Sequence, residues 1–329
     1  MRFHLDFTIP PLASPASYGQ KCLMMGSCFS EQIGIRLGGA KFDVMVNPHG
    51  ILYNPVSLTD ALETYLTGRT YKTQDLFHNR GIWHSWDHHG RFSHPDRNEA
   101  IRNIHASQRA AISRLKEADW LILTLGTAWV YRLKSQGRIV ANCHGVSSGE
   151  FVREILRPEE IIARLGNFLH RLSAYNNKVH VILTVSPVRH SREGIVQNNL
   201  SKSILLYAVH HLVNKFEATY YFPAYELIID DLRDYRFFEQ DLVHPNQQAV
   251  DYVWDHFIPF FLSSSSQTTL REVSEINRRL AHRPIFAQSD EYARFRNTLL
   301  EKMQELEACF DFLDFSAERK MVIEGGAFD

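Results

Sequence analysis

Short apolar runs alternate with longer segments of helical periodicity between residues 21 and 262, and this alternation is the strongest constraint on the fold. The apolar runs cover residues 21–26, 42–46, 120–125, 179–185 and 218–222. Helical patterns cover residues 29–37, 57–66, 98–118, 158–172, 196–216 and 247–261, with Ser57 as the expected N-cap of the second. Strands separated by helices in this way are typical of a parallel sheet covered on both faces. The pattern therefore predicts an α/β fold, with residues 68–97 as an irregular stretch.

The composition changes at the serine-rich segment 263–269, which predicts a domain boundary. We expect an α/β domain over residues 1–262 and a helical C-terminal extension over residues 263–329. The extension has one apolar stripe at helical spacing. Its members are Phe295, Leu299, Met303, Leu306, Phe310 and Leu313. Packing on its own domain is the favoured explanation of this stripe, and a homodimer formed through the helix is the alternative.

Composition and charge exclude several classes of protein. The chain has 36 basic and 37 acidic residues, so it lacks the positive surface of a dedicated nucleic-acid binder. No apolar run approaches the roughly 18 residues that span a membrane, and the N-terminus has no apolar core of a secretory signal. Four cysteines without CxxC spacing indicate neither a zinc site nor a disulfide framework. We expect a cytoplasmic protein without a metal or cofactor.

The end of the first predicted strand carries two side chains that can act as nucleophiles. Ser27 and Cys28 follow Gly26 and directly precede a helix. Backbone N–H groups at a helix N-terminus favour a developing negative charge, which suits an activated serine or cysteine. The alternative is structural, with Ser27 as a helix cap and Cys28 as a small buried side chain.

A second group with catalytic potential lies near the end of the α/β region. Asp241 and His244 are three residues apart, so the carboxylate can hold one ring nitrogen while the other faces a nucleophile. They precede the last predicted helix, at the sheet edge where open α/β folds place their sites. A surface ion pair is the alternative, and the combination with Ser27 or Cys28 favours catalysis.

Five short blocks in a fixed order resemble those of the GSCFA family, which belongs to the SGNH/GDSL hydrolase superfamily. The blocks are GSCFS (26–30), LGTAWVY (125–131), NCH (142–144), SPVRH (186–190) and DLVHPN (241–246). The resemblance extends from about residue 3 to residue 262. It implies a three-layer αβα sandwich with a parallel, flavodoxin-like sheet. It also implies an esterase or acyltransferase that forms a covalent acyl-enzyme.

The resemblance assigns roles residue by residue. Asp241 would orient His244, the general base, and Gly26 matches the glycine of the first block. Gly50 and Gly126 match glycines whose regions supply N–H donors to the oxyanion. The amide near residue 28 completes this expected oxyanion hole.

Two departures from the superfamily pattern leave alternatives open. The pattern Gly-Asp-Ser is Gly-Ser-Cys here, so a gapless register favours Cys28 as the nucleophile, and a shift of one residue favours Ser27. The asparagine that normally donates from the third block is absent after Gly126. Loss of such a donor costs about 100- to 1000-fold in rate, so a replacement is expected. The candidates are backbone N–H groups, the Thr127 hydroxyl, and an asparagine from elsewhere, such as Asn47 or Asn54.

Other polar residues have weaker support. His84 and His88 have i, i+4 spacing but no carboxylate companion, so a substrate-facing loop is favoured over a metal site. His144 could line the pocket. Arg189 could bind a carboxylate or phosphate of the substrate, and the alternative is an exposed arginine in a structural turn. We expect a small-molecule or glycan acyl ester or thioester, including lipid-like acyl groups, as substrate. The alternative is a non-catalytic ligand-binding or scaffolding protein.

Overall fold

The computed structural model describes residues 7–281 and 288–324. The first six residues of the predicted 1–262 domain lie outside these ranges. Residues 282–287 and 325–329 of the predicted extension also lie outside them. The described chain forms two compact units, each of which is treated by itself below. One unit comprises residues 7–10, 21–35 and 44–257, and the other comprises residues 11–20, 36–43 and 258–324.

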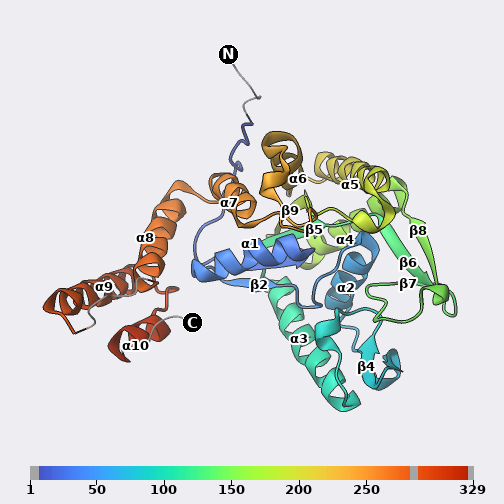
Figure 1. Ribbon diagram of the computed structural model, residues 1–329, viewed down its shortest axis with the longest axis horizontal. Helices are drawn as coiled ribbons and strands as arrows, with labels where there is room; N and C mark the ends of the chain where they lie inside the picture. The colour runs from blue at the N-terminus through green and yellow to red at the C-terminus, as the bar shows by residue number, and fades with distance from the viewer. Residues whose placement is uncertain (1–6, 282–287, 325–329) are drawn as a thin grey trace. The chain divides into compact units, whose positions relative to one another are not determined.

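The first unit is built around a five-stranded parallel sheet with the strand order β10–β9–β5–β1–β2 (Figure 1). The strands are β1 (Cys22–Gly26), β2 (Val44–Val46), β5 (Trp120–Leu125), β9 (His180–Val185) and β10 (Thr219–Tyr221). Counted along the chain, these five strands have the order 2-1-3-4-5, which is that of flavodoxin-like folds. The predicted parallel α/β sheet is therefore confirmed.

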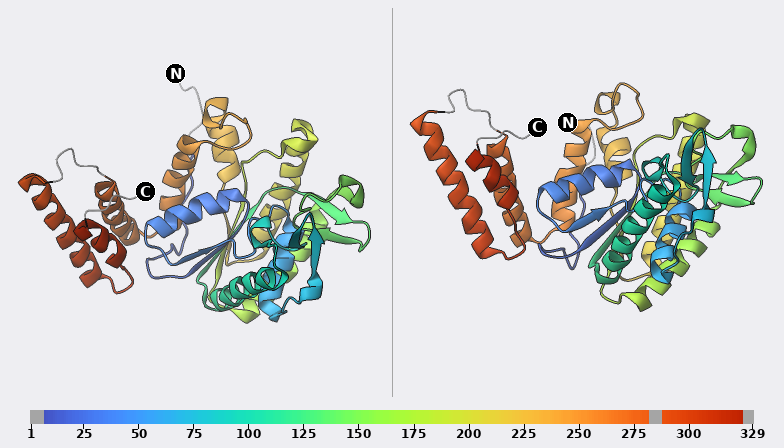
Figure 2. Two further views of the ribbon diagram at one scale, coloured as in Figure 1. Left: turned by 60° about the horizontal axis from the view of Figure 1, so that its bottom comes forward. Right: turned by 90° about the horizontal axis from the view of Figure 1, so that it is seen from below.

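Helices cover both faces of this sheet (Figure 2). Alternate residues of β1 point to opposite faces. Leu23 and Met25 pack into the core with side chains of four helices, whereas Met24 lines a small cavity with Phe29 and Phe257 on the other face. The four helices are α2 (Pro55–Thr67), α3 (Arg97–Glu117), α4 (Pro158–Tyr175) and α5 (Ile195–Lys215). Phe29 belongs to α1 (Cys28–Gly39) and Phe257 to α7 (Gln247–Phe261), so the unit has three layers.

Two small antiparallel elements and several short helices were not expected from the sequence. The stretch 68–97, predicted to be irregular, contains the hairpin of β3 (Leu76–Asn79) and β4 (Ile82–Ser85). A three-stranded sheet consists of β6 (Trp129–Leu133), β7 (Arg138–Val140) and β8 (Phe151–Ile155). These strands have three to five residues and are only partly apolar, so they lack a clear signal. The short helices are η1 (Thr73–Asp75), η2 (Gly90–Phe92), η3 (Ser148–Glu150), η4 (Ser191–Glu193), α6 (Ala224–Glu226), η5 (Leu227–Leu232) and η6 (Tyr235–Phe237).

The second unit contains the three helices α8 (Ser264–Leu280), α9 (Asp290–Cys309) and α10 (Ser316–Glu324). The serine-rich run lies within α8, because Ser263 caps this helix through the N–H of Ser266 at 3.3 Å. The apolar stripe contributes to the core of the unit, where Met303 packs with Val273 of α8. Packing inside its own unit therefore accounts for the stripe, and the homodimer stays a prediction. In the described ranges, each helix is too short or too polar to span a bilayer.

Candidate active site

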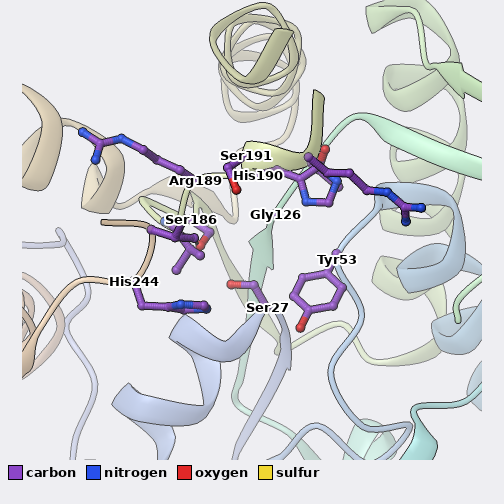
Figure 3. Close-up of a pocket in the computed structure, with 12 residues that line it drawn as sticks. Ser27, Tyr53, Gly126, Ser186, Arg189, His190, Ser191 and His244 are labelled. Carbon is purple, nitrogen blue, oxygen red and sulfur yellow. Dashed lines mark hydrogen bonds between the residues drawn. The ribbon is translucent and has the colours of Figure 1, made fainter. Parts of the chain in front are cut away.

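A pocket of about 340 Å³ lies where three neighbouring strands of the parallel sheet end (Figure 3). Ser27 follows β1, Gly126 follows β5 and Ser186 follows β9, and all three line the pocket. Strands β1 and β5 are also the pair at which the strand order reverses. Open α/β sheets bind ligands at the carboxyl ends of strands at such a point. The topology therefore places this pocket where a substrate is expected.

The turn between β1 and α1 depends on Gly26. Its φ is +137°, and a Cβ atom on it would lie 2.1 Å from the backbone oxygen of Thr124. The N–H of Gly26 donates to Oδ1 of the buried Asn47 at 2.9 Å, and the N–H of Ser27 donates to the Thr124 oxygen at 3.2 Å. These contacts bring the β1 tip close to β5. Asn47, a predicted oxyanion donor, thus fixes the strand tip through its side-chain oxygen.

Ser27 is the last residue before α1, and its side chain lines the pocket. Its Oγ accepts the N–H of Phe29 at 3.3 Å, so Ser27 also contributes to capping the helix. In Figure 3 the Ser27 side chain and the His244 ring point toward one another. The expected convergence of these two regions, which are more than 200 residues apart in the chain, is therefore present in the fold.

Asp241 holds the His244 ring in place. Nδ1 of His244 and Oδ2 of Asp241 are 2.6 Å apart. The other carboxylate oxygen accepts the N–H groups of Val243 at 2.8 Å and His244 at 3.0 Å. The hydrogen bond from His244 and these two N–H groups lower the pKa of Asp241 to about 2. The carboxylate therefore stays ionised at neutral pH, and Nε2 of His244 remains for the pocket.

Arg189 fastens the loop that carries His244. Its Nη1 donates to the oxygen of Leu242 at 2.9 Å, and its backbone N–H donates to the oxygen of Val243 at 3.2 Å. The guanidinium also lies over the rings of Phe238 at 4.0 Å and Tyr235 at 4.7 Å. Arg189 lines the pocket as expected, but these contacts show that much of its side chain holds the loop.

His244 also lines a smaller cavity of about 160 Å³ that includes Cys28. Ser27 and Cys28 therefore face different cavities on either side of the imidazole. Burial raises the pKa of the Cys28 thiol, whereas a nucleophilic cysteine needs a lowered pKa to form the thiolate. The gapless register favoured Cys28, but cavity size and ionisation both favour Ser27.

The backbone N–H groups of Gly50 and Gly126, which were expected near the oxyanion, and that of the neighbouring Thr127 already have acceptors. The N–H of Gly50 donates to Asn47 at 2.7 Å, and a Cβ on Gly50 would meet His89 at 2.1 Å. Gly50 is also absent from the lining of the pocket. The N–H groups of Gly126 and Thr127 donate to the oxygen of Tyr53 at 2.8 and 3.0 Å. Gly126 and Thr127 line the pocket as predicted. Their backbone N–H groups, however, are bonded to Tyr53 and are not left for an oxyanion.

The side-chain hydroxyl of Thr127 is the polar group best placed to replace the missing asparagine. It lies 3.1 Å from the hydroxyl of Ser201, which accepts the N–H of Ala128 at 2.7 Å. When Ser201 donates to Thr127, the Thr127 proton is left for a ligand. Asn54 is used elsewhere, because its Oδ1 accepts the N–H of Ser57 at 2.8 Å and caps α2. The expected cap by Ser57 is therefore wrong by three residues.

Sequence reasoning missed Lys202, a fully buried lysine of α5 behind the pocket floor. Its Nζ donates to the backbone oxygens of Gly126 and Ser186, each at 2.6 Å. It therefore joins the ends of β5 and β9. Burial lowers the pKa of Lys202 to about 7, opposed by Cys28. A neutral amine has two N–H groups, which match these two acceptors. The sequence did contain an indication of its burial, because Lys202 lies at helical spacing from the apolar residues Leu205 and Val209.

We expect Lys202→Met to remove part of the pH dependence of stability. Between pH 7 and 10 the unfolded chain keeps a proton on Lys202 that the folded chain has lost. The free energy of unfolding of the unaltered protein should therefore rise, relative to that of Lys202→Met, by up to about 1.4 kcal/mol per pH unit. Urea denaturation at pH 7, 8, 9 and 10 measures the difference, and parallel pH profiles would contradict the assignment.

Four histidines, His49, His84, His88 and His144, lie among aromatic rings away from the pocket lining. The ring of His88 stacks on that of His49 at 4.1 Å, and Nε2 of His144 donates to the oxygen of Ser85 at 2.8 Å. Burial lowers the pKa of His49 to about 3 and of His144 to about 4, so both rings are neutral. His144 is therefore not brought to the pocket. The described ranges contain no group of ligands suited to a metal ion.

Comparisons with known proteins complete the description. Three solved structures are similar to the chain at 10% identity: a carbohydrate esterase family 3 protein from Talaromyces cellulolyticus, an acetyl esterase mutant with acetate ion, and an acetyl xylan esterase from the rumen bacterium Butyrivibrio proteoclasticus. The first two have TM-scores of 0.35 and cover 78% of this chain and 99% of theirs. The third has a TM-score of 0.34 and covers 80% of this chain and 65% of its own. The fold assignment rests on the strand order and is independent of these scores.

A comparison with curated protein sequences gives no significant match. Two family models match, and together they extend over most of the chain. The C-terminal domain of GSCFA domain proteins matches residues 273–324, which include α9 and α10. The GSCFA family itself matches residues 21–257, which include every residue that lines the pocket. The chain therefore belongs to the GSCFA family.

Proposed function

We propose that this protein is an SGNH-type acyl hydrolase or acyltransferase that cleaves an ester or thioester through an acyl-enzyme on Ser27. The observation that carries the proposal is that Ser27 and His244 line one pocket while Asp241 holds the far nitrogen of His244. The flavodoxin-like strand order and the pocket at its switch point also support membership of the SGNH superfamily.

The residues act in sequence in this proposal. Nε2 of His244 accepts the proton of Ser27 as Oγ forms a bond to the substrate carbonyl carbon. Asp241 stabilises the resulting imidazolium. The tetrahedral intermediate then collapses, the bond to the leaving oxygen or sulfur breaks, and His244 returns the proton to that leaving group. Water or another acceptor attacks the acyl group on Ser27 by the same route, and its identity decides between hydrolysis and transfer.

Two features support stabilisation of the oxyanion. Ser27 precedes a twelve-residue helix, whose N-terminal dipole favours negative charge beside the nucleophile. Thr127 lines the pocket, and its hydroxyl can donate when Ser201 donates to it. Each such donor is worth about 100- to 1000-fold in rate.

The test uses His244→Ala with 4-nitrophenyl acetate as substrate. We expect turnover to fall by at least about 1000-fold, because the general base and its imidazolium are lost. His170→Ala, which removes an exposed histidine of α4, is the matched control. Intact-mass analysis after rapid acid quench should show an acetyl adduct in the control protein and none in His244→Ala. Equal turnover by the two variants would rule out the mechanism.

A non-catalytic ligand-binding protein is the second candidate. The observation that favours it is that the N–H groups of Gly50, Gly126 and Thr127 are already hydrogen-bonded. A fluorophosphonate probe distinguishes the two candidates, because it reacts only with an activated serine. Labelling of Ser27, found by peptide mapping, supports catalysis. A folded protein without label supports the binding protein.

A further inference from the structure

The segment that follows β9 brings positive charge to the pocket. Arg189, His190 and Arg192 line the pocket beside Ser191, and all follow β9. None of the lining residues, which all belong to the described part of the chain, has a carboxylate. Figure 3 shows His190 and Ser191 above Ser27, and His244 to its left. A ligand in this pocket therefore meets the guanidinium groups of Arg189 and Arg192, and no acidic side chain among the lining residues competes with it.

Arg189 and Arg192 differ in what they already contact. The Arg189 guanidinium donates to Leu242 and stacks on aromatic rings, as described above. The Arg192 guanidinium lies 5.4 Å from the centre of the Tyr131 ring. Within residues 7–281 and 288–324 it has no hydrogen bond or ion pair. Its five N–H donors are therefore open to a ligand in the pocket.

The carboxylate next in the chain does not neutralise Arg192. The Glu193 side chain is fully buried, with Oε1 2.9 Å from Nη1 of Arg153 and Oε2 3.0 Å from Nε2 of His190. Burial lowers the pKa of His190, so Arg153 is the cation that balances Glu193. These contacts fix the short helix η4 against β8 and leave the charge of Arg192 uncompensated.

Tyr131 gives the guanidinium a defined position. A cation over an aromatic face is attracted by the ring, and a planar guanidinium stacks well there. The Tyr131 hydroxyl is itself buried and has no hydrogen-bond partner among the described residues. The charged guanidinium of Arg192 and the neutral hydroxyl of Tyr131 thus both lack a hydrogen-bond acceptor among the described residues.

We propose that the acyl ester cleaved at Ser27 carries an anionic group, a carboxylate or a phosphate, which pairs with Arg192. The proposal rests on the proposed function and names its substrate class. Arginine binds both oxyanions through two parallel N–H donors, and such charge-assisted bonds are among the strongest polar contacts. Arg192 would thus select the substrate, while Ser27 and His244 perform the chemistry.

The test compares aryl acetates that differ in charge. The anionic probes are 4-acetoxybenzoate and 4-acetoxyphenyl phosphate, and the neutral probe is methyl 4-acetoxybenzoate. A second pair, 4-nitrophenyl hydrogen glutarate and 4-nitrophenyl valerate, moves the anion to the acyl side. We expect at least one anionic probe to have a kcat/KM roughly 10- to 100-fold above that of its neutral counterpart. The two aryl arms distinguish a carboxylate from a phosphate.

Arg192→Met should bring this ratio close to one, and Arg192→Lys should retain part of it because the charge remains. Arg109→Met removes an exposed arginine of α3 that does not line the pocket, and it should keep the full ratio. Equal kcat/KM values for charged and neutral esters in the unaltered protein would overturn the inference. A preference that survives Arg192→Met would overturn it as well.

Failure of the proposed function has a different signature. If none of the esters is turned over, the acyl-enzyme mechanism is wrong, and calorimetric titration with benzoate and inorganic phosphate then tests the anion site alone. Binding that is lost in Arg192→Met and kept in Arg109→Met supports the anion site. Absence of binding to the unaltered protein overturns it.

Discussion

Ser27→Ala should lower kcat for ester turnover by roughly 10⁴- to 10⁶-fold, the loss seen when the nucleophile of a serine hydrolase is removed. The substitution deletes a buried hydroxyl that accepts a long hydrogen bond, 3.3 Å, from the N–H of Phe29. We therefore expect the variant to stay folded, with a loss of stability of about 1 kcal/mol from the weakened cap. Steady-state kinetics and circular dichroism measure the two effects.

Cys28→Ala is the matched control, because it changes the neighbouring residue and the other cavity that His244 lines. We expect it to retain at least about a third of the activity and to form the same acyl adduct. The opposite result, with full loss in Cys28→Ala and activity in Ser27→Ala, would assign the nucleophile to the cysteine. Both variants therefore have to be measured on one substrate at one pH.

Gly26→Ala should have the largest effect on stability. A Cβ at this position would lie 2.1 Å from the oxygen of Thr124 and 2.9 Å from its carbon and nitrogen, and φ is +137°. Because these are backbone atoms of the neighbouring central strand, β1 and β5 would have to separate. We expect the free energy of unfolding to fall by more than about 3 kcal/mol, from strain and overpacking combined. Urea denaturation followed by tryptophan fluorescence measures the change.

Gly137→Ala measures the loss of stability caused by a positive φ alone, without a steric clash. Gly137 has a φ of +65°, and an added Cβ would meet no atom within 4 Å. Its substitution should cost only about 1 kcal/mol of backbone strain. If Gly26→Ala were as stable as Gly137→Ala, the close approach of the β1 tip to Thr124 would be contradicted.

The elements of the parallel sheet could be predicted because both faces of each central strand are buried. The run 120–125 is apolar without interruption, and the structure buries all six residues of β5. The hairpin β3–β4 has no such signal, since five of its eight residues are polar or exposed. The serine run has no apolar period of its own, and a helix begins inside this polar segment because Ser263 caps it.

The parts of the candidate site that could be predicted are those whose interacting residues are close together in the sequence. Asp241 and His244 are three residues apart, so one turn brings them together. The roles of Gly50, Asn47 and Asn54 depend on which acceptor each N–H group or side chain meets, and those partners are set by tertiary packing. Lys202 was missed for the same reason, because its two acceptors lie 76 and 16 residues away.

The short distance in the chain between Arg189 and Arg192 limits how the substrate specificity of this pocket can change. Arg189, which anchors the His244 loop, and Arg192, which lines the pocket without a hydrogen-bond or ion-pair partner among the described residues, are separated by only two residues. An insertion or deletion in this connection would shift the imidazole as well as the recognition surface. A single exchange at position 192 leaves the anchoring contacts in place. New preferences in relatives of this protein should therefore arise by point substitution here, with the length of the segment retained.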